Sequence, residues 1–280
     1  MAVTPNVCLT LSNQPENVLL VREALSGMAE TVGVDGVELN DIRTAVTEAC
    51  NNVVLHAYGG EEGPLQVELF LARDAVEVVV RDRGTGIKPH IRGEDEDALG
   101  IGLSIIQALA PRVEFKDVEG GGTEVRMEFT TPAAREVEEL LRGGFEAPTI
   151  AGPRLASTTA VAVGPSSLAR TVLPRVVCVL AARARFTTDR ISDAELVADA
   201  LVSEAFSASV GEHLQVALRV EPRELGLSVG PLGGGSAGRL IAARAEEASI
   251  GRLLEKLTDE RRVGSEGAFE TLELRLLDHR

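Results

Sequence analysis

The order of helical and β-like segments in the first 131 residues constrains the fold more than any other feature of this chain. A short strand precedes two long helical patterns, and two strands, a glycine-rich loop, a third helix and two more strands follow. Strands that are separated by helices and then pair locally build a mixed sheet with helices on one face. We therefore predict the α/β class, as a two-layer sandwich. In order, the predicted segments are residues 7–11, 15–32, 42–57, 65–72, 75–81, 82–87, 102–110, 113–118 and 123–131.

Boundaries follow from local signals. Residues 7–11 are expected to form a short edge strand, and Asn40 or Asp41 is predicted to cap the second helix because short polar side chains accept its free amides. Residues 1–131 are predicted to be one domain. Residues 132–165, with a short helical pattern at 136–142 and then many Pro, Gly, Ser and Thr residues, are predicted to be a linker. Residues 166–280 are then a second domain.

The second half repeats part of the first. Residues 65–69 (LQVEL) recur as 214–218 (LQVAL), and 47–49 (TEA) recur as 203–205 (SEA). Continued without gaps, this alignment puts Pro231 at the place of Asp82 and Asn52 near Ala208. Matches in the same order predict a degenerate second copy of the fold. The alternative is an unrelated α/β domain in which the glycine run 233–235 is only a loop.

Composition excludes several partners. The net charge of −15 argues against wrapping nucleic acid, which requires a basic surface. Three cysteines, an odd number without metal-like spacing, are typical of reduced thiols in a cytosolic protein. The chain opens on no secretory signal pattern, and no apolar run reaches the roughly 18 residues that cross a bilayer. We therefore expect a cytoplasmic protein without a membrane or nucleic-acid partner.

Polar residues recur on one face of the second predicted helix. Glu48, Asn52 and His56 are spaced four apart, so their side chains rise as a stripe along the helix. Taken alone, such a stripe is most often a solvated helix face.

A carboxylate ends the strand at 75–81. Asp82 is followed by Gly84 and Gly86, which gives the pattern Asp-x-Gly-x-Gly. The carboxylate can accept a hydrogen bond from an exocyclic amine such as that of adenine, and the glycines allow a flat base to approach the backbone. A tight turn capped by an aspartate is the structural alternative.

Two further glycine clusters follow. Gly100 and Gly102 are expected to open the third helix, where free amides and the helix dipole attract anions such as a triphosphate. Three glycines at 120–122 lead into a strand that begins with Thr123, whose hydroxyl is available for hydrogen bonding. Alone, either cluster would be a flexible loop.

Together, these four elements resemble the N, G1, G2 and G3 boxes of the histidine-kinase-like ATPase superfamily (GHKL), which includes gyrase, mismatch-repair ATPases and sensor kinases. The run from Glu48 to Tyr58 looks most like the bacterial anti-sigma factors that are serine/threonine kinases. The resemblance covers residues 1–131 and implies the Bergerat-type ATP-binding fold.

The resemblance also implies a role for each matching residue. Glu48 would act as general base on an incoming hydroxyl. Asn52 would coordinate Mg²⁺, which bridges the phosphate oxygens of ATP. Asp82 would bind the adenine amino group. Gly84 and Gly86 would flank the base, and Gly100 and Gly102 would present amides to the phosphates. Thr123 would reach adenine directly or through water. His56 is expected to be structural.

The implied function is that of an ATP-dependent protein serine kinase. Its partners would be a sigma factor or similar regulator and a small anti-anti-sigma antagonist protein, which it phosphorylates. An ATP-gated binding module without kinase activity is the alternative. The second half, without counterparts of Asn52 and Asp82, is expected to bind no nucleotide and to serve as an architectural unit. A homodimer and an internal pseudo-dimer both remain open.

Overall fold

The computed structural model describes residues 4–72, 74–85, 96–118, 120–131, 144–145, 158–242 and 249–279, with only the backbone of 96–100. The predicted order of elements in the first half is confirmed. These elements are β1 (Val7–Ser12), α1 (Asn17–Val32), α2 (Gly36–Asn52), the π-helical turn η1 (Val53–Ala57), β2 (Pro64–Ala72), β3 (Ala75–Asp82), α3 (Glu96–Leu109), β4 (Arg112–Asp117) and β5 (Thr123–Thr130).

The second half repeats this order, with one additional short helix, α6. Its elements are β6 (Thr158–Val163), α4 (Ser166–Arg183), α5 (Thr188–Ala205), the 3₁₀ turn η4 (Phe206–Ala208), β7 (Leu214–Glu221), β8 (Glu224–Gly233), α6 (Ser236–Ile241), α7 (Ile250–Leu257), β9 (Glu260–Glu266) and β10 (Phe269–Leu277). Strand β6 lies inside the segment predicted to be a linker, so the second unit begins before residue 166. The helical pattern at 136–142 lies outside the described residues.

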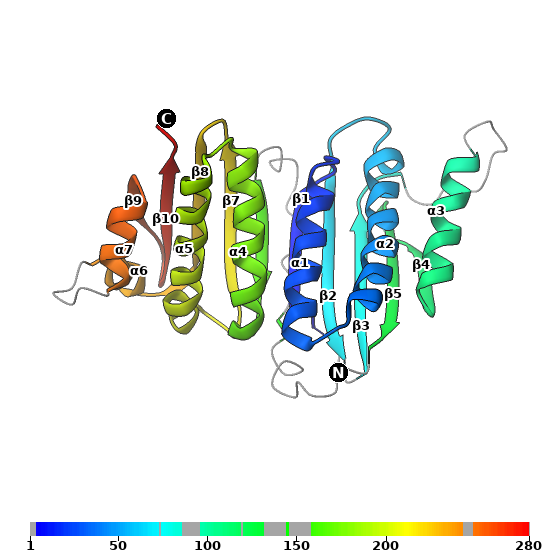
Figure 1. Cartoon of the computed structure of the whole chain (residues 1–280), viewed down its shortest axis with the longest axis horizontal. Coiled ribbons are helices and arrows are strands. Elements are labelled where there is room, and N and C mark those ends of the chain that lie inside the picture. Colours follow the sequence, from blue (N-terminus) through cyan, green and yellow to red (C-terminus); the bar gives the residue numbers. More distant parts are fainter. Residues whose placement is uncertain are drawn as a thin grey trace.

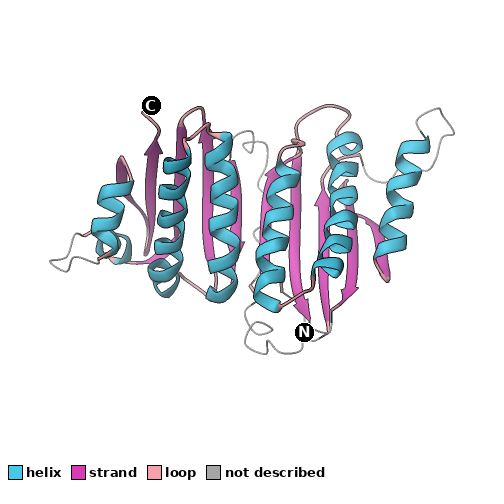
Figure 2. Ribbon diagram, in the orientation of Figure 1, coloured by secondary structure: helices cyan, strands magenta, loops and turns pink. Residues whose placement is uncertain are grey.

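The described strands form one ten-stranded sheet in the order β4-β5-β3-β2-β1-β6-β7-β8-β10-β9. The helices lie along one face of this sheet, as Figures 1 and 2 show. The prediction of a mixed sheet is wrong, because every described pairing is antiparallel. The reason is the pair α1 and α2: with two helices between β1 and β2 the chain reverses three times, so β2 returns alongside β1 in the opposite direction.

Strand β1 is central, and its prediction as an edge strand is wrong. It pairs with β2 on one side and with β6 on the other. A single row of side chains crosses both halves: Leu9 pairs with Val67, which pairs with Val80, while Val161 pairs with Val216, which pairs with Val229. The two halves of the sheet therefore match position by position. Asp82 and Pro231, each two residues beyond the last member of its row, occupy equivalent places, as the repeat predicted.

Helices α1 and α4 pack closely beside this central strand pair. A Cβ on Gly27 would lie 2.5 Å from the carbonyl oxygen of Thr171, so only glycine allows the approach. The hydroxyls of Thr31 and Thr171 are 2.7 Å apart. Arg175 donates to Glu30 at 2.5 Å. One continuous apolar cluster runs under the helices of both halves.

Helices α2 and α5 correspond through their buried faces. Counted from the N-cap residues Asp35 and Thr187, Glu204 stands at the place of Asn52 and Ala200 at that of Glu48. The earlier match of Glu204 with Glu48 and the placing of Asn52 near Ala208 are therefore wrong, because packing against the sheet sets the alignment. The buried residues with matching spacing are Ile42, Ala45, Val46, Ala49 and Cys50 in α2 and Ala194, Val197, Ala198, Leu201 and Val202 in α5.

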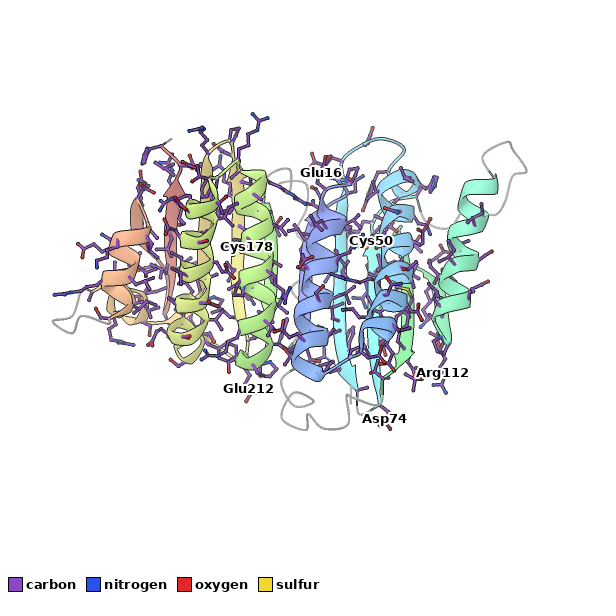
Figure 3. The ribbon with its side chains drawn as sticks, in the orientation of Figure 1. Glu16, Cys50, Asp74, Arg112, Cys178 and Glu212 are labelled. Atoms are coloured by element: carbon purple, nitrogen blue, oxygen red, sulfur yellow. The ribbon has the colours of Figure 1, made fainter. Side chains whose placement is uncertain are left out.

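The three cysteines are free, as predicted. Cys50 lies on α2 and Cys178 on α4, in different halves of the molecule (Figure 3). Across the described ranges, no helix combines the length and apolar character needed to span a bilayer.

Candidate functional site

Helix α2 carries the first two predicted site residues. It begins earlier than predicted because the carboxylate of Asp35 accepts hydrogen bonds from the amides of Val37 and Glu38, at 2.8 and 2.9 Å, in the manner of an N-cap. Neither Asn40 nor Asp41 is the cap. The buried face of α2 packs on the sheet, and Glu48 and Asn52 remain half-buried on another face.

Gly102 of helix α3 faces these two side chains. A Cβ at Gly102 would lie 3.2 Å from Oε2 of Glu48 and 3.6 Å from Oδ1 of Asn52. The structure thus brings a carboxylate, an amide oxygen and a side-chain-free stretch of helix into one place. Any side chain at residue 102 would press on Glu48, so the glycine is what allows α3 to approach these two polar groups.

Helix α3 differs from the prediction at its start. It begins at Glu96, so Gly100 and Gly102 lie inside its first two turns and do not open it. An α-helix leaves only its first four amides unpaired, and the anion site expected at these glycines is therefore absent from the described backbone in this conformation. Gly86 and the rest of 86–95 lie outside the described residues.

Asp82 ends strand β3 with its side chain buried, only 4% exposed. Its Oδ1 accepts a hydrogen bond of 2.7 Å from the amide of Gly84. The amide and hydroxyl of Thr123 also hydrogen-bond the carboxylate, although burial outweighs them and raises the pKa of Asp82 above its ordinary value. Asp82 and Thr123, predicted from separate motifs, are therefore direct partners.

Two glycines make the approach of these loops possible. A Cβ on Gly84 would lie 2.1 Å from the carbonyl oxygen of Ala57. Gly122 has a φ of +107°, and its Cβ would lie 2.1 Å from the carbonyl oxygen of Asp82. Any side chain at either position would separate the strand-end acid from its neighbours.

The turn η1 joins the two groups of site residues. It follows Asn52 directly, and the carbonyl of Ala57 at its end accepts a hydrogen bond of 3.0 Å from the amide of Thr85. The loop after Asp82 is thus bonded to the turn after Asn52. Single π-turns within helices are frequent at functional sites. His56 lies in this turn, where the changed helical period ends the stripe, and its side chain is exposed.

Tyr58 follows the same turn; it ends the run that carries the family resemblance, but the sequence predicts no role for it. Its hydroxyl accepts a hydrogen bond of 2.8 Å from the amide of Arg83 and donates to the carbonyl of Pro64. Only its position at the end of the Glu48–Tyr58 run could have drawn attention to it.

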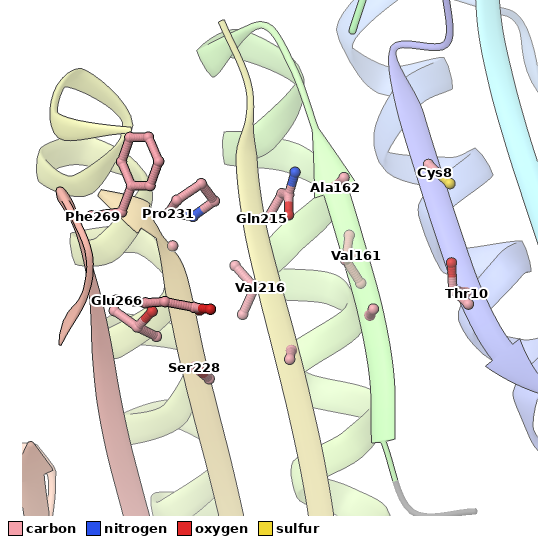
Figure 4. Close-up of a pocket in the computed structure, with 14 residues that line it drawn as sticks. Cys8, Thr10, Val161, Ala162, Gln215, Val216, Ser228, Pro231, Glu266 and Phe269 are labelled. Atoms are coloured by element: carbon pink, nitrogen blue, oxygen red, sulfur yellow. The ribbon is translucent and has the colours of Figure 1, made fainter. Parts of the chain in front are cut away.

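A cavity of about 420 Å³ lies elsewhere, on the sheet face away from the helices (Figure 4). None of the predicted site residues lines it. Among its lining residues are Cys8, Thr10, Gln215, Ser228, Glu266 and Phe269.

The equivalent region of the second half lacks these groups. Pro231 replaces Asp82 and has no acceptor in its side chain. Glu204 and Ala200 replace Asn52 and Glu48. Counted along β10 from Leu272, the partner of Val229, Glu270 takes the place of Thr123, although a bulge pairs it with Leu232. Its carboxylate accepts a hydrogen bond of 2.9 Å from the amide of Ala237.

Comparison with known proteins finds relatives of the first half. Residues 11–129 match the family described as histidine kinase-like ATPase domain. The serine-protein kinase RsbW of Listeria monocytogenes is 37% identical over 127 residues, which cover 41% of this chain and 81% of the relative. RsbW of Bacillus pumilus is 34% identical over 122 residues, 38% of this chain and 75% of the relative.

Solved structures give weaker matches. Crystal form I of TP0453 is 10% identical, with a TM-score of 0.37, and covers 98% of this chain and 90% of that one. The RsbU and RsbW domains of Rv1364c from Mycobacterium tuberculosis are 10% identical, with a TM-score of 0.27 and coverage of 98% and 87%. No argument about the second half follows from scores of this size. The sequence relatives do decide the family: through its first half, the chain belongs to the histidine kinase-like ATPases, in the group of the RsbW serine-protein kinases.

Proposed function

We propose that this protein binds Mg-ATP in the first half and transfers the γ-phosphoryl group to a serine of a protein partner. The observation that carries the proposal is the convergence of Glu48, Asn52 and Gly102 between α2 and α3. Relatives that are named serine-protein kinases support the reaction type.

The residues fit the nucleotide in chemical terms. Asp82 is a buried acceptor beside a threonine hydroxyl, which suits the amino group of adenine. Gly84 and Gly122 remove side chains from the surrounding loops. The amide oxygen of Asn52 is a hard ligand that Mg²⁺ accepts together with phosphate oxygens and water. The bound metal supplies neutralisation of charge on the phosphates.

Glu48 takes the part of the base. The serine oxygen attacks the γ-phosphorus, the bond between that phosphorus and the bridging oxygen of ADP breaks, and the serine proton passes to the Glu48 carboxylate. Transfer of this kind depends on positioning and on electrostatic stabilisation rather than on covalent chemistry of the protein. Glu48 and Asn52, one helical turn apart, hold base and metal ligand in a fixed relation.

Phosphate binding requires a change in α3. The amides of Gly100 and Gly102 lie within the helix, so they reach the phosphates only when its first turns open. We assign the start of α3 to the part of the protein that responds to ATP.

The partners follow from the same resemblance. A sigma factor or similar regulator is bound, and a small antagonist protein carries the phosphorylated serine. The second half, with Pro231 and Glu204 at the critical places, binds no nucleotide and completes the ten-stranded sheet as an internal pseudo-dimer partner.

Calorimetry tests the proposal. Asn52→Ala should weaken Mg-ATP binding at least tenfold, the effect of losing one hydrogen-bonding or ligating group, while Asn40→Ala on the exposed side of the same helix should not. Glu48→Gln should bind Mg-ATP as the wild type does and form no phosphoserine on a candidate antagonist protein. Equal affinity in Asn52→Ala would contradict the site. A wild type that binds Mg-ATP but phosphorylates no partner would favour the ATP-gated binding module.

A further inference from the structure

Tyr58 connects three segments that are distant in sequence. Its hydroxyl accepts from the amide of Arg83 at 2.8 Å and donates to the carbonyl of Pro64. Its ring packs directly against Gly63, where a Cβ would lie 2.1 Å from the ring carbon Cε1, so a side chain at residue 63 would displace the ring. Burial raises the pKa of Tyr58 to about 12, so the phenol keeps its proton at neutral pH and remains a donor.

The bond to Arg83 controls the peptide group after Asp82. A peptide is planar, so holding the N–H of Arg83 also fixes the direction of the carbonyl of Asp82. That carbonyl lies against Gly122, where even a Cβ would be 2.1 Å away. Rotation of this peptide would move the backbone from which the Asp82 carboxylate extends.

The amides that follow Asp82 each have a separate acceptor. Arg83 donates to the hydroxyl of Tyr58, Gly84 to the carboxylate of Asp82 and Thr85 to the carbonyl of Ala57. Two of these acceptors, Ala57 and Tyr58, lie in the turn η1 that follows helix α2 and in the residue after that turn. The loop after Asp82 is therefore held by the segment that follows α2. Of the three acceptors, only the Tyr58 hydroxyl belongs to a side chain outside the loop.

We propose that Tyr58 is a positioning residue that orients Asp82 for selection of adenine over guanine. The inference rests on the proposed function. Adenine offers an amino group to the carboxylate, whereas guanine has a carbonyl oxygen at the corresponding ring position, which the carboxylate repels. A site built to accept such a hydrogen bond discriminates strongly against a base that lacks the donor, provided that its acceptor is held in place.

The test uses Tyr58→Phe in the full chain, which keeps the ring and removes the hydroxyl. Affinities for Mg-ATP and Mg-GTP are measured by calorimetry, with Thr44→Val as the matched control. Thr44 lies on the same helix, and its hydroxyl donates only locally, to the carbonyl of Asn40 at 2.8 Å. We expect Tyr58→Phe to weaken ATP binding about tenfold and GTP binding less than about twofold, while Thr44→Val changes neither.

The ratio of the two affinities separates positioning from a general structural effect. If Tyr58→Phe weakens ATP and GTP binding equally, so that the ratio of the two affinities stays at its wild-type value, the inference is wrong. The proposed function is unaffected by that result as long as the wild type prefers ATP. A wild type that binds no Mg-ATP would overturn the proposed function and this inference with it. Phosphoryl transfer at saturating ATP should stay within about twofold of wild type, because the base Glu48 is not part of this contact.

Discussion

Leu9 in β1 pairs in register with Val161 in β6, and the two residues are each other's counterparts in the two halves of the chain. Pairing of a residue with its own equivalent is what a two-fold axis produces in a symmetric dimer. Here one chain supplies both sides, so the axis is internal. Both edges of β1 are paired, one with β2 and the other with β6. A homodimer therefore has no free edge of this strand through which to form.

The first prediction concerns the oligomeric state. Analytical ultracentrifugation of the full chain should give a monomer of 29.6 kDa, because β6 covers the edge of β1. A fragment of residues 1–131 exposes that edge, and unpaired strand edges associate. The fragment should therefore dimerise. A full chain that dimerises as strongly as the fragment would contradict the internal axis.

Gly27→Ala should destabilise the protein although it lies inside helix α1, where alanine is normally favoured by about 1 kcal/mol. The added Cβ would lie 2.5 Å from the carbonyl oxygen of Thr171, so α1 and α4 must move apart. We expect a loss of about 1–3 kcal/mol in the free energy of unfolding, measured by urea denaturation. Gly238→Ala in α6, whose Cβ would meet nothing within 4 Å, is the control and should be neutral or stabilising.

Asp82→Asn should weaken ATP binding about 10- to 100-fold, since it removes a charged hydrogen-bond acceptor. Exposed Glu62→Gln, also an acid-to-amide change, should leave binding unaltered. Calorimetry measures both, and equal affinity in Asp82→Asn would remove this residue from the site.

The same substitution should stabilise the fold at neutral pH. Burial raises the pKa of Asp82 in the folded state, so its protonated form favours folding below the unfolded pKa, and that contribution is lost as the pH rises through the folded pKa. The stability gain of Asp82→Asn over wild type should therefore be present at pH 7 and vanish below about pH 4. Thermal unfolding across this range measures it, and a gain that grows toward low pH would show the opposite shift.

Titration should give one nucleotide per chain. The second half has Pro231 and Glu204 where the first has Asp82 and Asn52, which removes the base acceptor and adds a negative charge where phosphates would lie. Binding of fluorescent ATP to the wild type should saturate at one equivalent, and Asp82→Asn should shift that single phase to about 10- to 100-fold higher ATP concentration. Saturation at two equivalents in the wild type would mean that the second half also binds nucleotide.

Local patterns were sufficient for most of the first half. Helix α1 and strands β2, β3, β4 and β5 were predicted within two residues of their ends, because side-chain periodicity depends on near neighbours. The strand-end acid Asp82 and the half-buried pair Glu48 and Asn52 were also evident, since each is marked by residues within one or two helical turns or within one loop.

The sequence alone predicts the order of elements and the residue types of the site, and it favours a second copy of the fold over an unrelated domain. Only the tertiary structure decided that β1 is central, that Glu204 replaces Asn52, that α3 begins at Glu96 and that Tyr58 holds the loop of Asp82. Each of these depends on contacts between segments that are distant along the chain. Glycine disfavours the helix by only about 1 kcal/mol per residue, so packing can keep α3 helical at Gly100 and Gly102. The second partner of β1 is β6, more than 140 residues away along the chain. Contacts between such distant segments produce no periodic pattern in the sequence of either segment, so the sequence alone does not reveal them.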